Sequence, residues 1–127
     1  MLDAYSIDLP EFIEKYKSAP VQQKVGMNIE KIISAINNKD YKYIYSKLDD
    51  TFKNSQFPTQ ESLKSYIESN LYNKNSIEYT EFSEEGGLYV YKTKITNKNI
   101  SNSQAKNLNI IMQLGEGTNF TMSFSVE

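Results

Sequence analysis

The sequence predicts an α+β domain, in which helices from the amino-terminal half cover one face of an antiparallel sheet from the carboxyl-terminal half. Up to about residue 71, apolar residues recur at spacings of three and four, the period of an amphipathic helix. From Ser76 onward they alternate with polar residues, which is typical of half-buried strands. Turn residues at 83–87 and 115–118 join successive strands, so we expect neighbouring strands to pair as a meander.

Two helices are expected first. A short one begins at an Asp8 cap with Pro10 in its first turn, and it ends before Pro20, which disfavours helical geometry in the preceding residue. A longer helix covers 21–38, with valine and isoleucine along one stripe. Gly26 interrupts it at a cost of about 1 kcal/mol relative to alanine, so we expect a bend or a close contact there.

Two further helices are each preceded by a capping side chain. Asp40 caps a helix over 41–48, and Thr59 caps another that ends near residue 71. Between them, 51–54 is interpreted as a short strand or a plain connection. The expected order is therefore α-α-β-α-β-β-β-β, preceded by an extra amino-terminal helix.

The first long strand carries a conflict in its alternation. Ile77 and Tyr79 share one face, whereas Glu78 and Phe82 share the other. Under strict alternation, whichever face is buried, the strand turns either Glu78 or Glu81 toward the interior. This is the best indication of an interior carboxylate, although a glutamate near a strand end or a sheet edge reaches water easily.

The last two strands predict an uncharged outer face. If their apolar residues face the helices, the outward residues are Asn107, Asn109, Ile111, Gln113, Thr121, Ser123 and Ser125. Such a face lacks the charges that usually keep sheets apart, so it suits a homodimer contact. An ordinary solvated face is the alternative.

Composition excludes several classes of function. The 14 basic residues are all lysine, and the net charge is −2, so we expect no nucleic-acid partner. The absence of cysteine and histidine excludes thiol chemistry, imidazole acid-base catalysis and the usual zinc sites. We expect no cofactor and assign neither a metal site nor a catalytic residue.

Two stretches carry a family resemblance. INNKDYKYIYSKLDDTFKN at 36–54 and PTQESLKSYI at 58–67, followed by the final hairpin, resemble the NTF2-like (cystatin-like α+β cone) superfamily. The resemblance covers about residues 20–127. Residues 1–19 lie outside it and are interpreted as a helical extension or linker.

The resemblance implies a strongly curved sheet wrapped around helices, often with a pocket at the open end of the cone. Such a pocket would take a small apolar or amphipathic ligand. Tyr45, Tyr66 and Tyr79 lie on the inward stripes of three elements, so they are the expected ligand-binding residues together with Glu81. The alternative is that each tyrosine ring fills the core and sends its hydroxyl to solvent.

Three functions follow as expectations. The first is a non-catalytic ligand-binding or protein-interaction module of a bacterial protein, exported or membrane-attached because the polar segment 1–19 resembles a stalk. The second is a small-molecule enzyme, such as an isomerase or dehydratase, that uses an interior carboxylate with a tyrosine. The third is a homodimeric structural domain. Fold alone does not choose among them.

Overall fold

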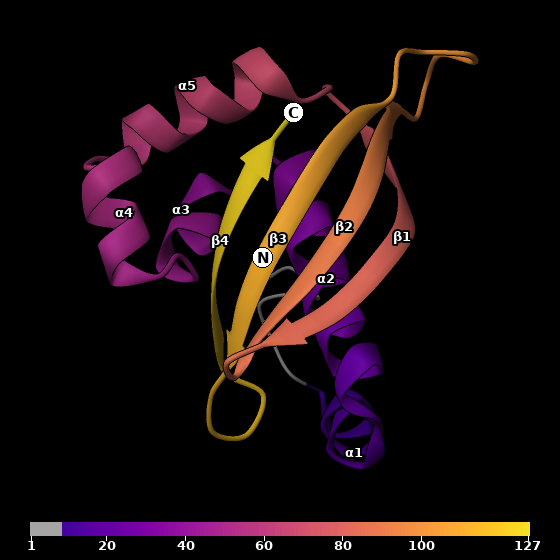
Figure 1. The fold of residues 1–127 in the computed structure, drawn as a ribbon. Helices are drawn as coiled ribbons and strands as arrows, with labels where there is room; N and C mark the ends of the chain where they lie inside the picture. The colour runs from indigo at the N-terminus through magenta and orange to yellow at the C-terminus, as the bar shows by residue number, and fades with distance from the viewer. Residues whose placement is uncertain (1–8) are drawn as a thin grey trace.

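The structure is a computed structural model that describes residues 9–127. The Asp8 cap expected for the first helix lies outside the described residues. The helices are α1 Pro10–Ser18, α2 Val21–Asn37, α3 Tyr41–Ser46, α4 Asp50–Gln56 and α5 Gln60–Asn70. The strands are β1 Asn75–Glu85, β2 Leu88–Asn97, β3 Lys106–Leu114 and β4 Phe120–Val126. The α+β prediction is confirmed, with helices first and strands second (Figure 1).

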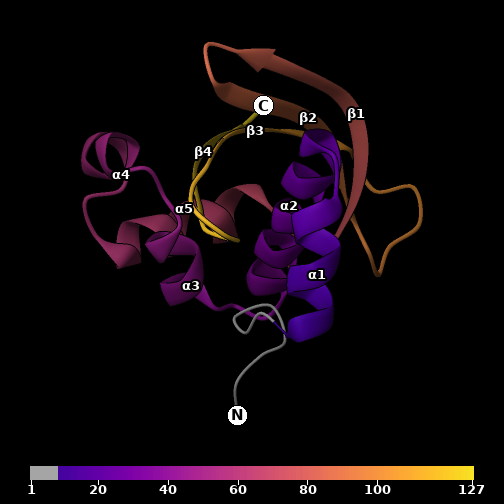
Figure 2. The same cartoon turned by 90° about the horizontal axis from the view of Figure 1, so that it is seen from below.

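The four strands form one antiparallel sheet in the order β1-β2-β3-β4. Seen from below, the sheet is an arc, and α2 lies inside it with α1 alongside (Figure 2). The helices α3, α4 and α5 gather at the β4 end of the sheet, and α5 shares a small apolar cavity with α2 and the sheet. The β1–β2 end of the sheet therefore lies beside α1 and α2, whereas the β4 end lies beside α3, α4 and α5.

The core forms where α2 crosses the concave face. Ile29 and Ile32 of α2 are buried, as are Leu108, Ile110 and Met112 of β3. The apolar face predicted for the last two strands is thus the buried one, and burial of each such side chain contributes about 1.5–3 kcal/mol. Ile111, on the opposite face of β3, is 39% exposed.

The predicted short strand at 51–54 is wrong, because α4 occupies these residues. The Asp49 side chain accepts a hydrogen bond from the Phe52 backbone N–H at 3.1 Å, so it caps α4. The chain meets the sheet edge just before this cap: Leu48 forms a single parallel bridge with Met122, and the Asp49 N–H donates to the Met122 carbonyl at 2.8 Å. The chain therefore pairs with the sheet edge at a single bridge and then enters α4.

The caps predicted at Asp40 and Thr59 are both present. The Asp40 carboxylate accepts from the Tyr43 N–H at 3.1 Å at the start of α3. Thr59 and Ser62 exchange side chain to backbone hydrogen bonds in a capping box at the start of α5.

A β-bulge in β1 removes the conflict over the two glutamates. Tyr79 pairs with Thr93 and Glu81 pairs with Lys92, so Thr80 is an extra residue without a cross-strand partner. The extra residue shifts the alternation by one position, and Phe82 returns to the face that carries Tyr79. Both glutamates then lie exposed, which contradicts the expectation that one of them turns inward.

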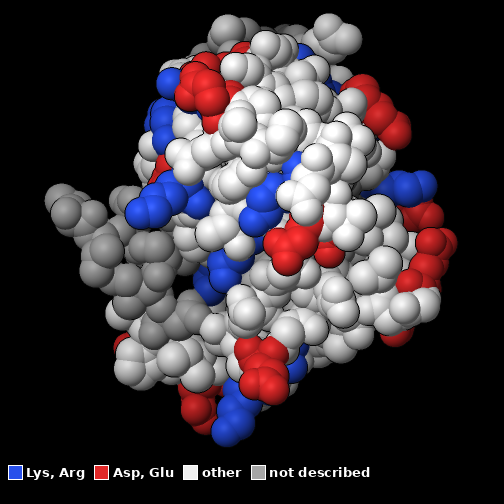
Figure 3. Space-filling model, turned by 90° about the vertical axis from the view of Figure 1, so that its left-hand side faces the viewer, with Lys and Arg blue, Asp and Glu red and all other residues white. Residues whose placement is uncertain are grey.

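The surface seen from the side of α4 mixes both signs of charge. Figure 3 shows basic and acidic side chains interspersed among uncharged ones on this face. Such a surface has no single-sign field that would attract a polyanion. Among the helices within residues 9–127, none combines the length and apolar character that a membrane span requires.

Candidate functional site

A groove of about 540 Å³ lies between the α1–α2 helices and the β1–β2 end of the sheet. It opens to solvent and is lined by Lys15, Pro20, Gln22, Gln23, Gly26, Met27, Glu30, Tyr79 and Tyr91. Its volume lies within the range of about 300–1,000 Å³ that is typical of small-molecule sites. We refer to these nine residues as the α2 groove.

The helix α2 supplies one wall because its two faces carry different residues. Gln22, Gly26 and Glu30 are spaced four apart, so they lie on one face and line the groove. Val25 and Ile29 lie on the other face, and both are fully buried against the core. The periodicity that anchors the helix thus also presents its polar stripe to the groove.

Gly26 leaves the groove wall open. A Cβ atom built at this residue would have no other heavy atom within 4 Å, apart from its chain neighbours and the nearby helix backbone. Of the bend or close contact expected at Gly26, no contact crowds the position of a Cβ atom. Its carbonyl oxygen lies 3.5 Å from the Tyr79 hydroxyl.

Tyr79 and Glu30 form a short hydrogen bond across the groove. The Tyr79 hydroxyl donates to Oε1 of Glu30 at 2.6 Å. Burial raises the pKa of Tyr79 well above its ordinary value, and the hydrogen bond to Glu30 and the charge of that carboxylate raise this pKa further. Tyr79 therefore keeps its proton at neutral pH and acts as a hydrogen-bond donor.

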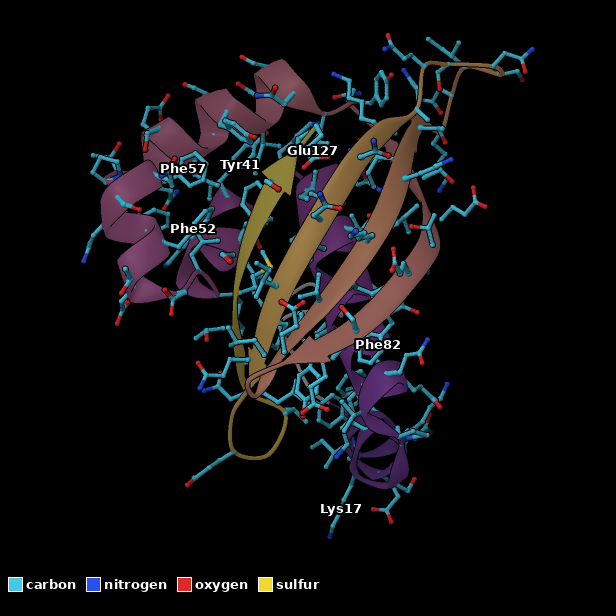
Figure 4. All side chains as sticks on the ribbon, viewed as in Figure 1. Lys17, Tyr41, Phe52, Phe57, Phe82 and Glu127 are labelled. Carbon is cyan, nitrogen blue, oxygen red and sulfur yellow. The ribbon has the colours of Figure 1, made fainter. Side chains whose placement is uncertain are left out.

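Aromatic rings continue from Tyr79 along the concave face of β1 and β2. The centroids of Tyr79 and Tyr91 are 4.9 Å apart, and those of Tyr91 and Phe82 are 5.2 Å apart. Gln22 orients Tyr91, since its Nε2 donates to the Tyr91 hydroxyl at 3.2 Å. Phe82 joins this row because the bulge turns it inward, and Figure 4 shows it at the lower end of the sheet, near α2.

Tyr45 and Tyr66, two of the predicted ligand-binding residues, lie away from the α2 groove. The Tyr45 hydroxyl donates to the Phe57 carbonyl at 2.9 Å, and the Tyr66 hydroxyl accepts from the Val126 N–H at 3.4 Å. The Tyr66 ring packs edge-on against Phe57, at a centroid distance of 5.2 Å. Figure 4 shows Phe57 beside α4, across the molecule from Phe82. These two tyrosines therefore bond within the packed side of the arc.

Glu81, the fourth predicted residue, lies on the outer face of the sheet. Its carboxylate is 3.5 Å from the Lys92 ammonium, and its side chain is 66% exposed. Of the four predicted residues, only Tyr79 lines the groove. Glu30 and Gln22 are not among the predicted residues, although their spacing of four residues on either side of Gly26 places them on one helix face.

The centre of the arc holds almost no empty space. A cavity between α2, α5 and the sheet has a volume of about 10 Å³ and is lined by apolar residues that include Ile36, Ile67 and Met122. This volume is at the lower limit for a single water molecule. A ligand of ordinary size would therefore not fit into this central cavity.

The acidic residues of the described chain lie at its surface. None of the aspartates and glutamates within residues 9–127 is buried, and no three of them gather into a set that could hold a metal ion. Asp40 and Asp49 are engaged as helix caps. The α2 groove therefore presents hydrogen-bonding groups and aromatic rings, and no buried acid-base pair occurs within residues 9–127.

Comparisons of the chain with protein-family models, with curated proteins and with solved structures find no match. The structure itself establishes an α+β domain with a four-stranded antiparallel sheet, a shape that is compatible with a cone.

Proposed function

We propose that the chain is an NTF2-like, cone-shaped domain that binds a small amphipathic molecule in the α2 groove without catalysing a reaction. The wider setting expected from the sequence, an exported or membrane-attached bacterial protein, is part of this proposal. The observation that carries it is the glycine in the groove wall.

Gly26 lowers the stability of α2, and no contact among the described residues requires a glycine at this position. A glycine inside a helix costs about 0.5–1 kcal/mol relative to alanine. A side chain at this residue would meet open space, so packing does not require its absence. Residues that break a local rule without a structural cause are expected at functional sites. The unfilled space is where a ligand would contact the helix backbone.

The remaining groove residues suit an amphipathic ligand. Met27 and Pro20 provide apolar contacts, the rings of Tyr79 and Tyr91 provide flat aromatic surface, and two glutamines offer amide hydrogen bonds. The exposed positions of the carboxylates support this binding proposal over the isomerase or dehydratase alternative, since acid-base catalysts are usually enclosed so that their pKa values shift.

Binding of an uncharged fluorescent probe tests the proposal. N-phenyl-1-naphthylamine fluoresces when it enters an apolar site, and we expect saturable binding to the wild-type chain. The substitution Gly26→Leu should reduce binding at least tenfold, because Gly26 lines the groove and the leucine side chain would start from a Cβ atom that meets open space there.

The matched control is Ser34→Leu, which adds the same side chain at an exposed residue of α2 that does not line the groove. This variant should bind the probe as the wild type does. Equal binding by the wild type and Gly26→Leu, or an equal loss in both variants, would refute the proposed site.

A homodimer through the outer face of β3 and β4 is the second candidate function. Ile111 is 39% exposed at the centre of this face, and its neighbours Gln113 and Ser123 are uncharged. Such a surface suits a sheet contact between two copies. Sedimentation equilibrium should then detect dimers that Ile111→Lys dissociates, and a monomer at high micromolar concentration would remove this candidate.

A further inference from the structure

Within the described residues, the Glu30 carboxylate accepts a hydrogen bond at only one of its two oxygens. One oxygen accepts the Tyr79 hydroxyl, whereas the other accepts no hydrogen bond from residues 9–127. No ion pair joins Glu30 to a lysine of the described chain, including Lys15 at the groove rim. In this hydrogen bond the Tyr79 hydroxyl is the donor and the Glu30 carboxylate the acceptor, so one carboxylate oxygen remains for a ligand.

The two tyrosine rings beside Glu30 also lack a cation. Elsewhere in residues 9–127, lysine ammonium groups lie 4.1–5.8 Å from the centroids of six aromatic rings. Those rings are Phe12, Tyr16, Tyr43, Tyr45, Tyr72 and Phe120. Tyr79 and Tyr91 have no such partner among the described residues, although they form a tilted pair at the groove surface.

A carboxylate oxygen and two aromatic rings that no lysine of the described residues covers are the groups that recognise an organic ammonium ion. We propose that the ligand of the α2 groove carries an ammonium group, which binds between Glu30 and the rings of Tyr79 and Tyr91. Its apolar part lies along Met27 and Pro20. This inference rests on the proposed function, because it names the class of ligand that the same groove takes.

Two probes of nearly equal shape separate charge from apolar contact. Phenethylammonium carries a positive charge at pH 7, and 2-phenylethanol replaces the ammonium group with a hydroxyl. Isothermal titration of the complete chain with each probe gives two dissociation constants. The wild type should bind phenethylammonium about tenfold more tightly than the alcohol, a free-energy preference of about 1.4 kcal/mol.

The substitution Glu30→Gln should remove most of this preference while leaving the affinity for 2-phenylethanol nearly unchanged. The control Glu78→Gln deletes one negative charge at an exposed residue of β1, opposite Lys94 on the outer face. It changes the net charge by the same amount, so it should retain the tenfold preference. Added salt should weaken only the binding of phenethylammonium.

The outcomes distinguish this inference from the proposed function. If both probes bind the wild type equally and Gly26→Leu blocks both, the groove binds ligands but the ammonium inference is wrong. The inference also fails if Glu30→Gln keeps the tenfold preference. If neither probe shows saturable binding up to about 10 mM, the ammonium inference is refuted, and the naphthylamine titration decides whether the groove binds other ligands.

Discussion

At the scale of single residues, Gly26 and Tyr79 connect the stability of the fold to the groove. Gly26 leaves space beside the helix backbone, and Tyr79 fills part of the facing wall. The Tyr79 hydroxyl is bonded to the Glu30 carboxylate, so its proton is retained. A substitution at either residue should therefore change the stability of the chain in the absence of ligand.

Gly26→Ala should stabilise the chain by about 0.5–1 kcal/mol, since alanine is the better helix former and its Cβ would meet no neighbour. Thermal unfolding should show the midpoint rise by about 3–5 °C. The control is Gly117→Ala. Gly117 has a φ of 59°, which strains any residue with a Cβ atom, so this substitution should lower the midpoint. A fall in the midpoint of Gly26→Ala would show that α2 needs the glycine for packing.

Tyr79→Phe should change how stability depends on pH. The ordinary pKa of tyrosine is 10.0, and the pKa of Tyr79 is higher in the folded chain. Above about pH 10 the unfolded chain therefore releases a proton that the folded chain retains. The contribution of Tyr79 to stability is fully present below that pH and declines as the pH rises toward the folded pKa. Urea unfolding at about pH 8 and about pH 10.5 should show a larger loss in the wild type than in Tyr79→Phe, and equal losses would contradict the raised pKa.

At the scale of elements, the bulge in β1 decides which side chains face the groove. Thr80 is the extra residue, and its hydroxyl donates to the Lys92 carbonyl at 2.8 Å. With this insertion Tyr79 and Phe82 share the concave face, and Glu81 faces solvent. A regular strand would exchange the sides of Glu81 and Phe82.

Deleting Thr80 should therefore be tolerated better than deleting its neighbour Glu78. Loss of Thr80 removes the bulge and one exposed hydrogen bond, at a cost of about 1 kcal/mol, and it leaves the inward residues in place. Loss of Glu78 shifts the register by one and turns either Ile77 or Tyr79 to solvent, which costs roughly 2 kcal/mol for each displaced side chain. Urea unfolding measures both, and equal losses would show that Thr80 does not set the register.

The helices and strands could be predicted where a strong periodicity coincides with a capping residue. The caps at Asp40 and Thr59 and the inward face of the last two strands follow from local chemistry that does not depend on distant contacts. The strand predicted at 51–54 is wrong because Asp49 contacts the sheet edge with its backbone and caps a helix with its side chain. The chain therefore continues as α4 and not as a strand. The bulge at Thr80 could not be predicted, since nothing in the strand pattern marks which residue is unpaired.

At the scale of the whole molecule, the concave side divides into a packed part and an open part. Beside α5, an aromatic cluster that includes Phe57 and Tyr66 fills the space, and the central cavity is about 10 Å³. Beside α2, the groove of about 540 Å³ remains open. This division explains why Tyr45 and Tyr66 bond within the fold whereas Tyr79 faces the groove.

The sequence could place Tyr79 on an inward face, but it could not place the site. The groove needs the approach of α2 to the β1–β2 end of the sheet, which sets Glu30 within 2.6 Å of the Tyr79 hydroxyl across 49 positions of sequence. Such a contact depends on helix packing and strand curvature together. A sequence pattern supplies the faces of each element and leaves their mutual arrangement undetermined.

Nuclear magnetic resonance with a labelled chain tests the central claim, that ligands bind in the α2 groove, most directly. Phenethylammonium is added stepwise while the backbone amide shifts are followed. The account predicts saturable shift changes confined to residues 15–30 and 79–91, and their loss in Gly26→Leu. Changes centred on the outer face at 107–113, or no saturable changes at any residue, would contradict it.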